Sequence, residues 1–180
     1  KQAVLGEVMY GKIEGSPEIY VLAADVEKSF IKTPEDFRNR VVLAFDPEQI
    51  LSLSVKNPAG DFDVSFLGNG WGWKTPLKSR HVDQDAATGM ALELRHLKFK
   101  KYLGVQDGDA PAWQTPLAKI SVSLKGGAAP RVLLLGPKLP DGSYLAKLES
   151  KPDVFVLDSR QAAPLLKGLA VSSVTPQLQQ

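Results

Sequence analysis

Residue types that could hold a metal ion gather in one short stretch of the chain. His81, Asp83 and Asp85 alternate with Val82 and Gln84. In an extended segment alternate side chains share a face, so an imidazole and two carboxylates could meet one cation there. A helix is predicted directly afterwards, however, and an aspartate before a helix accepts hydrogen bonds from the unpaired amides of its first turn. We therefore interpret Asp83 or Asp85 as a helix cap and predict no metal site.

Two further stretches have residue types that bind ions or phosphate, but each lacks part of the required pattern. Asp107 and Asp109 flank a glycine without the other oxygen ligands of a calcium loop. The glycine-rich residues 68–72 lack the lysine and hydroxyl side chain of a phosphate-binding loop. Both stretches are predicted to be turns.

The chain offers little for nucleophilic catalysis. It contains no cysteine, which excludes thiolate nucleophiles, disulfides and cysteine-ligated metals. No serine lies in a nucleophile elbow, and only His81 and His96 could assist one. A hydrolase site assembled from distant acidic residues or histidines is the remaining enzymatic alternative. We predict a non-enzymatic protein that needs no cofactor.

Aromatic and basic side chains supply a candidate interaction surface. Tryptophan is enriched in binding hot spots, and clustered cations attract acidic partners or anionic lipid. Half-buried packing of the tryptophans and a solvated helix C-terminus are the alternative interpretations. The candidate surface residues are Trp71, Trp73, Trp113, Arg95, Lys98, Lys100 and Lys101. The net charge of +2 creates no global field for nucleic acid, which is not expected as a partner.

The elements that must position these side chains follow from hydrophobic periodicity. Segments that alternate between apolar and polar residues predict strands with one buried face, and a 3.6-residue period predicts helices. The predicted strands are 3–10, 18–22, 51–55, 62–66, 71–73, 120–124, 132–135, 144–149 and 154–157. The predicted helices are two short ones within 26–40, a strong one at 82–97 and one at 160–169 that is interrupted near Pro164. This predicts an α+β fold, with antiparallel sheets and a few packed helices.

Two of the predicted hairpins share an ungapped sequence pattern. The comparison runs from Leu5-Gly6 to Leu22 and from Leu135-Gly136 to Leu157, and in each copy residues 12–14 or 147–149 lead to the apolar strand that ends it. Each strand is followed by a segment of helical character. We predict a duplicated hairpin-plus-helix unit, with chance similarity of amphipathic hairpins as the alternative. Stacked like units typically build scaffolds or binding surfaces.

The order of several short motifs resembles a known family. They are Trp71-x-Trp73-x-x-Pro76, the helix over 83–97, Tyr102-Leu103-Gly104, Leu135-Gly136, and the Val154–Leu157 strand before a closing helix. In this order they resemble the bacterial domain of unknown function 4340 over nearly the whole chain. In that register residues 1–45 resemble the closing half of one module, residues 46–170 a nearly complete second module, and residues 171–180 a flexible tail.

The resemblance implies an envelope protein that faces the periplasm, with no established activity. Its members are commonly anchored by an N-terminal membrane segment and are sometimes encoded beside transporter or gliding-motility components. We therefore expect other envelope proteins as partners and an anchoring segment before Lys1. The leading hypothesis is an interaction or scaffold module auxiliary to a transport or motility complex. The alternative is a periplasmic binding module for a peptide, glycan or lipid, and the sequence favours no particular oligomeric state.

Overall fold

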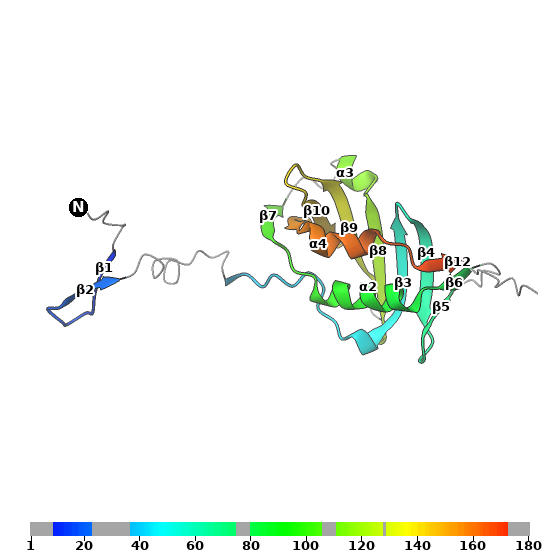
Figure 1. Ribbon diagram of the computed structural model, residues 1–180, viewed down its shortest axis with the longest axis horizontal. Helices are drawn as coiled ribbons and strands as arrows, with labels where there is room; N and C mark the ends of the chain where they lie inside the picture. Colours follow the sequence, from blue (N-terminus) through cyan, green and yellow to red (C-terminus); the bar gives the residue numbers. More distant parts are fainter. Residues whose placement is uncertain (1–8, 23–36, 75–79, 106–110, 128, 173–180) are drawn as a thin grey trace, which may run out of the picture. The chain divides into compact units, whose positions relative to one another are not determined.

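A computed structural model describes residues 9–22, 37–74, 80–105, 111–127 and 129–172 (Figure 1). The chain divides into two compact units, Lys1–Asn39 and Arg40–Gln180. Residues 40–45 belong to the second unit, where the Val42 amide donates to the Leu97 carbonyl at 2.9 Å and Leu43 is buried.

The described part of the first unit is an antiparallel hairpin of β1 (Met9–Lys12) and β2 (Ile19–Leu22). The Ser16 amide donates to the Ile13 carbonyl at 3.0 Å and closes the turn, in which Gly15 has φ +82°. A positive φ at the third turn position defines a type II turn and favours glycine. The hairpin prediction is confirmed, whereas the helices predicted within 26–40 lie largely outside the described residues.

The second unit is built on one eight-stranded antiparallel sheet with the order β5-β4-β3-β8-β9-β10-β11-β7. Its strands are β3 (Ile50–Asn57), β4 (Gly60–Phe66), β5 (Trp71–Trp73), β7 (Lys101–Val105), β8 (Ala118–Leu124), β9 (Arg131–Lys138), β10 (Tyr144–Leu148) and β11 (Asp153–Leu157). The predicted meander is therefore β3-β4-β5. The coarse prediction of an α+β fold on an antiparallel sheet is confirmed.

The alternation of apolar and polar residues along the strands determines which face of the sheet is buried. In β8 every second side chain, from Ala118 through Ile120 and Val122, lies in the core, and Leu53 and Val64 continue the same buried face on β3 and β4. The intervening side chains on these strands include several serines and point to the other face, because successive residues of a strand face opposite sides.

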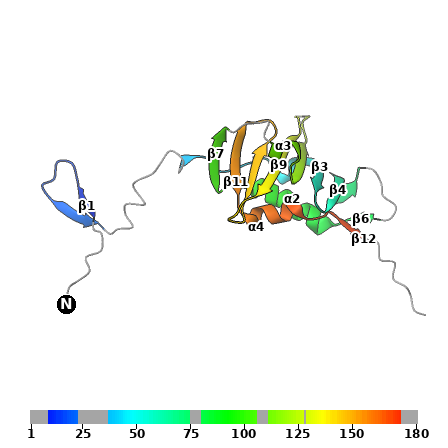
Figure 2. The ribbon, with the colours of Figure 1, turned by 90° about the horizontal axis from the view of Figure 1, so that it is seen from above.

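Helix α2 (Gln84–His96) covers the buried face of the sheet together with the C-terminal helices (Figure 2). Asp83 is its N-cap and accepts a hydrogen bond from the Ala86 amide at 2.9 Å, as predicted. Met90 and Leu94 lie on its buried face, one turn apart, which is the spacing that faces a core. None of the helices among the described residues is long and apolar enough to cross a membrane.

The C-terminal part closes the core with short elements. Helix α4 (Ser159–Ala162) continues into the 3-10 helix η3 (Ala163–Leu166), so the helical geometry changes next to Pro164 as predicted. The Asn57 side chain at the end of β3 holds η3 in place, because its Nδ2 donates to the carbonyls of Leu165 and Lys167 at 2.9 Å each.

Several elements differ from the sequence prediction. β7 and the one-turn helix α3 (Pro111–Gln114) were not among the predicted strands and helices. β6 (Arg80–Val82) pairs with β12 (Ala170–Ser172), although a flexible tail was expected from residue 171. These pairs form between segments far apart in sequence, so local periodicity does not indicate them.

Candidate functional site

An apolar groove of about 500 Å³ lies beside Trp71, where α2, the β4–β5 turn and the 3-10 helix η2 (Pro47–Gln49) meet. It is lined by Pro47, Glu48, Phe66, Gly68, Trp71, Thr88, Ala91, Leu92 and Lys125. Apolar side chains make most of this lining, while Glu48 and Lys125 bring one charge of each sign. The composition suits an amphipathic ligand or an apolar side chain of a partner.

Trp71 forms part of this groove rather than projecting from it. Its side chain is only 8% exposed, its indole Nε1 donates to Thr88 Oγ1 at 3.2 Å, and its ring meets Phe66 edge to face at 5.4 Å. Leu92 on α2 is 44% exposed, so the apolar surface open to a ligand comes mainly from Leu92 and Phe66.

The backbone of Trp71 is bound by a side chain where a neighbouring strand would lie. Gln84 Oε1 accepts from the Trp71 amide at 2.7 Å, and Gln84 Nε2 donates to the Trp71 carbonyl at 2.8 Å. The side-chain amide of Gln84 thus pairs with both the backbone N–H and the backbone C=O of Trp71 on the terminal strand β5. Sequence reasoning missed this role, because it depends on the docking of α2 against β5.

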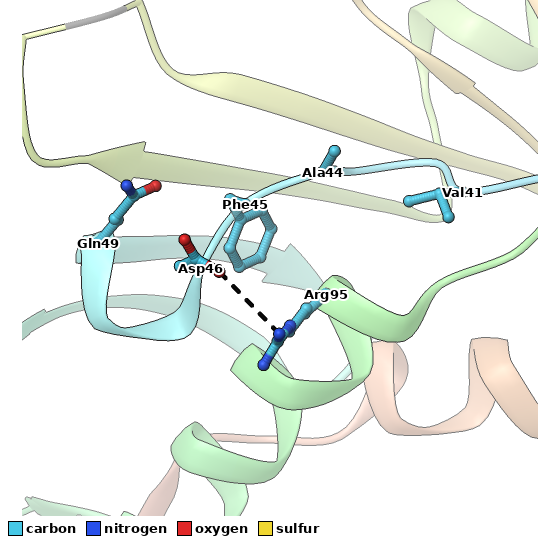
Figure 3. Close-up of a pocket in the computed structure, with 6 residues that line it drawn as sticks. All are labelled: Val41, Ala44, Phe45, Asp46, Gln49 and Arg95. Carbon is cyan, nitrogen blue, oxygen red and sulfur yellow. Dashed lines mark ion pairs between the residues drawn. The ribbon is translucent and has the colours of Figure 1, made fainter. Parts of the chain in front are cut away.

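A second hollow of about 440 Å³ is lined by Val41, Ala44, Phe45, Asp46, Gln49 and Arg95 (Figure 3). Arg95 points toward Asp46, and the closest approach of their charged groups is 4.0 Å. Arg131 donates to the Ala44 carbonyl on the adjoining segment. Because both charged groups are well exposed to water, this ion pair stabilises the fold only weakly.

The predicted basic patch is divided among different contacts. Arg95 faces Asp46, whereas Lys100 forms an ion pair with Asp141 at 3.2 Å. Lys98 and Lys101 are exposed, the first after α2 and the second on β7. These four cations therefore do not point into a common site.

The three tryptophans likewise do not form one surface. Trp73 is half-buried and stacks on Phe62 with a centroid distance of 6.4 Å, so it packs on the α2 side of the sheet like Trp71. Trp113 packs against Gly136, and the ammonium of Lys147 lies 5.2 Å from its ring centroid. Lys147 alternates with the core residue Ala146, which places Trp113 over the opposite face of the sheet.

The candidate metal ligands also take other roles. His81 is exposed on β6, Asp83 caps α2, and Asp85 is exposed in the first turn. Within the described parts of the chain no three histidine or carboxylate side chains are grouped as metal ligands would be. Asp107 and Asp109 lie outside those parts. The glycines after β4 form the predicted turn, in which the Leu67 amide donates to the Gly70 carbonyl at 2.8 Å.

Shifted pKa values occur at surface turns and caps. The hydroxyl and amide of Ser143, together with Lys100, lower the pKa of Asp141 to about 2. The Arg160 amide lowers the pKa of Asp158, the N-cap of α4. A hydrogen bond to Glu18 raises the pKa of the Tyr20 hydroxyl. The carboxylates at these positions stabilise local turns and a helix end.

The β1–β2 hairpin carries several exposed apolar side chains. Among the described residues β1 and β2 pair only with each other. The exposed side chains are Tyr10, Ile13, Ile19, Tyr20 and Val21, between 42% and 68% accessible. Sequence reasoning missed this surface, because an apolar strand pattern ordinarily predicts burial.

The two hairpins of the chain have the same pairing. Each residue pair of β1–β2 corresponds to a pair of β10–β11 that lies 135 positions later, from Met9–Leu22 with Tyr144–Leu157 to Lys12–Ile19 with Lys147–Val154. The turn hydrogen bond from Ser16 to Ile13 corresponds to that from Lys151 to Leu148, and both measure 3.0 Å.

A family comparison assigns the chain. The family described as Domain of unknown function (DUF4340) matches residues 4–116 of the 180. The chain belongs to this family. The DUF4340 match includes the hairpin, the β3-β4-β5 meander, α2 and β7, and it ends before β8. No curated protein and no solved structure gives a significant match.

Proposed function

We propose that this DUF4340 chain is a non-enzymatic interaction module and that the β1–β2 hairpin is its contact surface. The exposed apolar side chains of the hairpin carry the proposal. An isolated two-stranded hairpin is marginally stable in water, and exposed contiguous apolar surface is typical of interaction sites. A partner that covers Tyr10, Ile19 and Val21, which share one face of the hairpin, would remove that surface from water.

The proposed setting is the cell envelope, on the periplasmic side, in a protein auxiliary to a transport or motility complex. This part of the proposal rests on the family resemblance. The proposed partners are other envelope proteins, and the full-length protein is proposed to be held at the membrane by a segment outside these 180 residues.

The hairpin is further proposed to be one copy of a diverged duplication, with β10–β11 and α4 as the other copy. The equal pairing of the two hairpins supports it, as do the matched side chains Lys12 and Lys147, and Tyr20 and Phe155. A unit that is packed in one copy and exposed in the other has surface left for a partner.

Site-specific photo-crosslinking in native cells tests the interaction proposal. A photoreactive residue at Val21 is expected to give a discrete adduct with another protein, and the matched control at the exposed Leu117 of the second unit is not. Equal adducts at both positions, or none at Val21, would contradict the hairpin as the contact surface.

The apolar groove favours a second candidate function, the binding of a peptide, glycan or lipid next to Trp71. Its volume and its Phe66, Trp71 and Leu92 lining support this alternative. Native mass spectrometry of protein purified from its own cells is expected to show a bound mass that Leu92→Arg abolishes. A control variant at the exposed Glu93 should retain that mass.

A further inference from the structure

The hydrogen-bond donors around the apolar groove beside Trp71 are already engaged within the protein. The Trp71 amide donates to Gln84 Oε1 at 2.7 Å, and the Trp71 indole Nε1 donates to Thr88 Oγ1 at 3.2 Å. The Lys125 amide donates to the Gln49 carbonyl at 2.7 Å. The Trp71 carbonyl likewise accepts from Gln84 Nε2 at 2.8 Å. These three N–H groups therefore cannot serve a ligand unless an existing hydrogen bond breaks.

This arrangement discriminates among a peptide, a glycan and a lipid as ligands of the groove. A peptide brings backbone amides and a glycan brings hydroxyl groups, and a buried polar group without a hydrogen-bond partner costs free energy. A hydrocarbon chain has no such group and gains free energy as it leaves water. The apolar side chains that it would contact are Pro47, Phe66, Trp71, Ala91 and Leu92. The lining of the groove therefore favours a lipid.

Two side chains of opposite charge, Glu48 and Lys125, line one wall of the groove. Glu48 belongs to η2 and Lys125 directly follows β8, and the hydrogen bond from the Lys125 amide to Gln49 joins these two segments. Within the described part of the chain, neither charged group has an ion pair or a hydrogen bond. One ligand that carries both an anion and a cation can therefore pair with both of them.

We infer that the groove binds a single-chain phospholipid with a zwitterionic headgroup of the phosphoethanolamine type. The acyl chain lies against Phe66 and Leu92, which are 39% and 44% exposed. The phosphate pairs with Lys125, and the primary ammonium donates to the Glu48 carboxylate. The groove of about 500 Å³ lies in the lower half of the roughly 300–1,000 Å³ range of small-ligand sites, which suits one acyl chain. The inference rests on the second candidate function, ligand binding at this groove, and names the class of ligand.

Lauroyl lysophosphatidylethanolamine, kept below its micelle concentration, is the probe. Isothermal titration calorimetry with the full 180-residue chain is expected to show saturable binding, and the amide resonances of residues 66–72 and 88–92 should shift. Leu92→Arg should weaken binding roughly ten-fold or more, because it places a charge against the acyl chain. Leu51→Arg is the matched control. Leu51 is also 44% exposed and does not line the groove, so this variant should bind as the wild type does.

The headgroup is tested by its charge. Lauroyl lysophosphatidylglycerol keeps the acyl chain and the phosphate but lacks the ammonium. The wild type should bind it about five-fold more weakly, the upper end of the effect of an exposed ion pair. Glu48→Gln should remove this preference, whereas Glu93→Gln, at an exposed position of α2 outside the groove, should keep it. Lys125→Gln should weaken the binding of both lipids alike.

The outcomes separate this inference from the function on which it rests. Absence of lipid binding, or equal binding by the wild type and Leu92→Arg, would overturn the lipid as ligand. Equal binding of the two lipids by the wild type, or a preference that Glu48→Gln retains, would overturn the zwitterionic headgroup. If protein from its own cells still carries a peptide or a glycan that Leu92→Arg abolishes, ligand binding at the groove stands and only the ligand class is wrong. If it carries no such mass and binds no lipid, both fail.

Discussion

Gln84 shows how a single side chain can protect the end of a sheet. Unpaired amide and carbonyl groups on an edge strand attract other strands, and proteins cover such edges in several ways. Here the carboxamide of Gln84 makes both hydrogen bonds of Trp71 within 2.8 Å, as a paired strand would. The side chain comes from the first turn of α2, so the helix position and the edge protection depend on each other.

Gln84→Ala is expected to destabilise the protein by about 1–3 kcal/mol, since it leaves partly buried backbone groups of Trp71 without partners. Chemical denaturation measures this loss. The variant should also self-associate at high concentration in gel filtration, because the β5 edge becomes open. Glu93→Ala, at an exposed position of the same helix, is the control, and an equal effect of the two changes would contradict the role of Gln84.

Asn57 is a second side chain whose contribution can be measured. Its Nδ2 holds two carbonyls at the end of η3, and its Oδ1 accepts from the Ala59 amide at 2.9 Å. Asn57→Ala is expected to cost about 1–3 kcal/mol in the free energy of unfolding, because the carbonyls lose their donor. Asn69→Ala in the exposed β4–β5 turn should cost much less. Thermal or urea unfolding of the two variants distinguishes the outcomes.

Asp141 gives the protein a pH-dependent contribution with a defined sign. Its pKa falls from 3.8 to about 2 in the folded state, chiefly because it accepts from the Ser143 hydroxyl and amide. A carboxyl with a depressed folded pKa stabilises the fold fully above its unfolded pKa, and the stabilisation is lost as pH falls through the folded value. The wild type should therefore be more stable than Asp141→Asn above about pH 4, and its free energy of unfolding should approach that of the variant as the pH falls to about 2. A difference that stays constant over this range would contradict the assignment.

Among the elements, helix α2 is stabilised at its N-terminus by the side chain of its N-cap residue, Asp83. Asp83→Ala removes the acceptor for the Ala86 amide and is expected to cost about 1 kcal/mol of stability. Asp85→Ala in the same turn removes only a charge near the positive end of the helix dipole, and should cost about 0.3–1 kcal/mol. Circular dichroism during urea unfolding measures both. The reverse order of the two losses would show that Asp83 is not the effective cap.

The elements that the sequence predicted are those with local signals. The meander, α2 and both hairpins combine a regular hydrophobic period with a turn or cap next to it. β6, β7 and β12 have three to five residues each and pair with partners far away in the chain, so periodicity alone does not reveal them. Residues 26–36, in the predicted helical region before the second unit, belong to the part outside the described residues.

The candidate surface was harder to predict than the elements, because it depends on how distant strands are placed. Trp71 and Trp113 were both assigned to one candidate surface, yet they pack on opposite faces of the sheet. The position of Trp113 follows from its contact with Gly136, where an added Cβ would lie 3.0 Å from the ring. No local pattern contains that contact.

At the scale of the whole molecule, the second unit contains the complete eight-stranded sheet and its helical cover. Residues 40–180 alone are expected to unfold with the same denaturant midpoint as the full chain, because the core residues all lie within them. Parallel unfolding curves of the two proteins check this. A clearly lower midpoint for residues 40–180 would show that the first unit stabilises the second.

The pairing of β3 with β8 in the middle of the sheet has a consequence for biosynthesis. Roughly 60 residues separate the two strands, which a ribosome adds in about 3–12 seconds. During that interval β3 and β4 can already pair, but the other edge of β3 has no partner. Ser52, Ser54 and Lys56 alternate along that waiting strand with its apolar residues. Polar and charged residues in a hydrophobic strand limit aggregation, so their placement protects the nascent chain until β8 emerges.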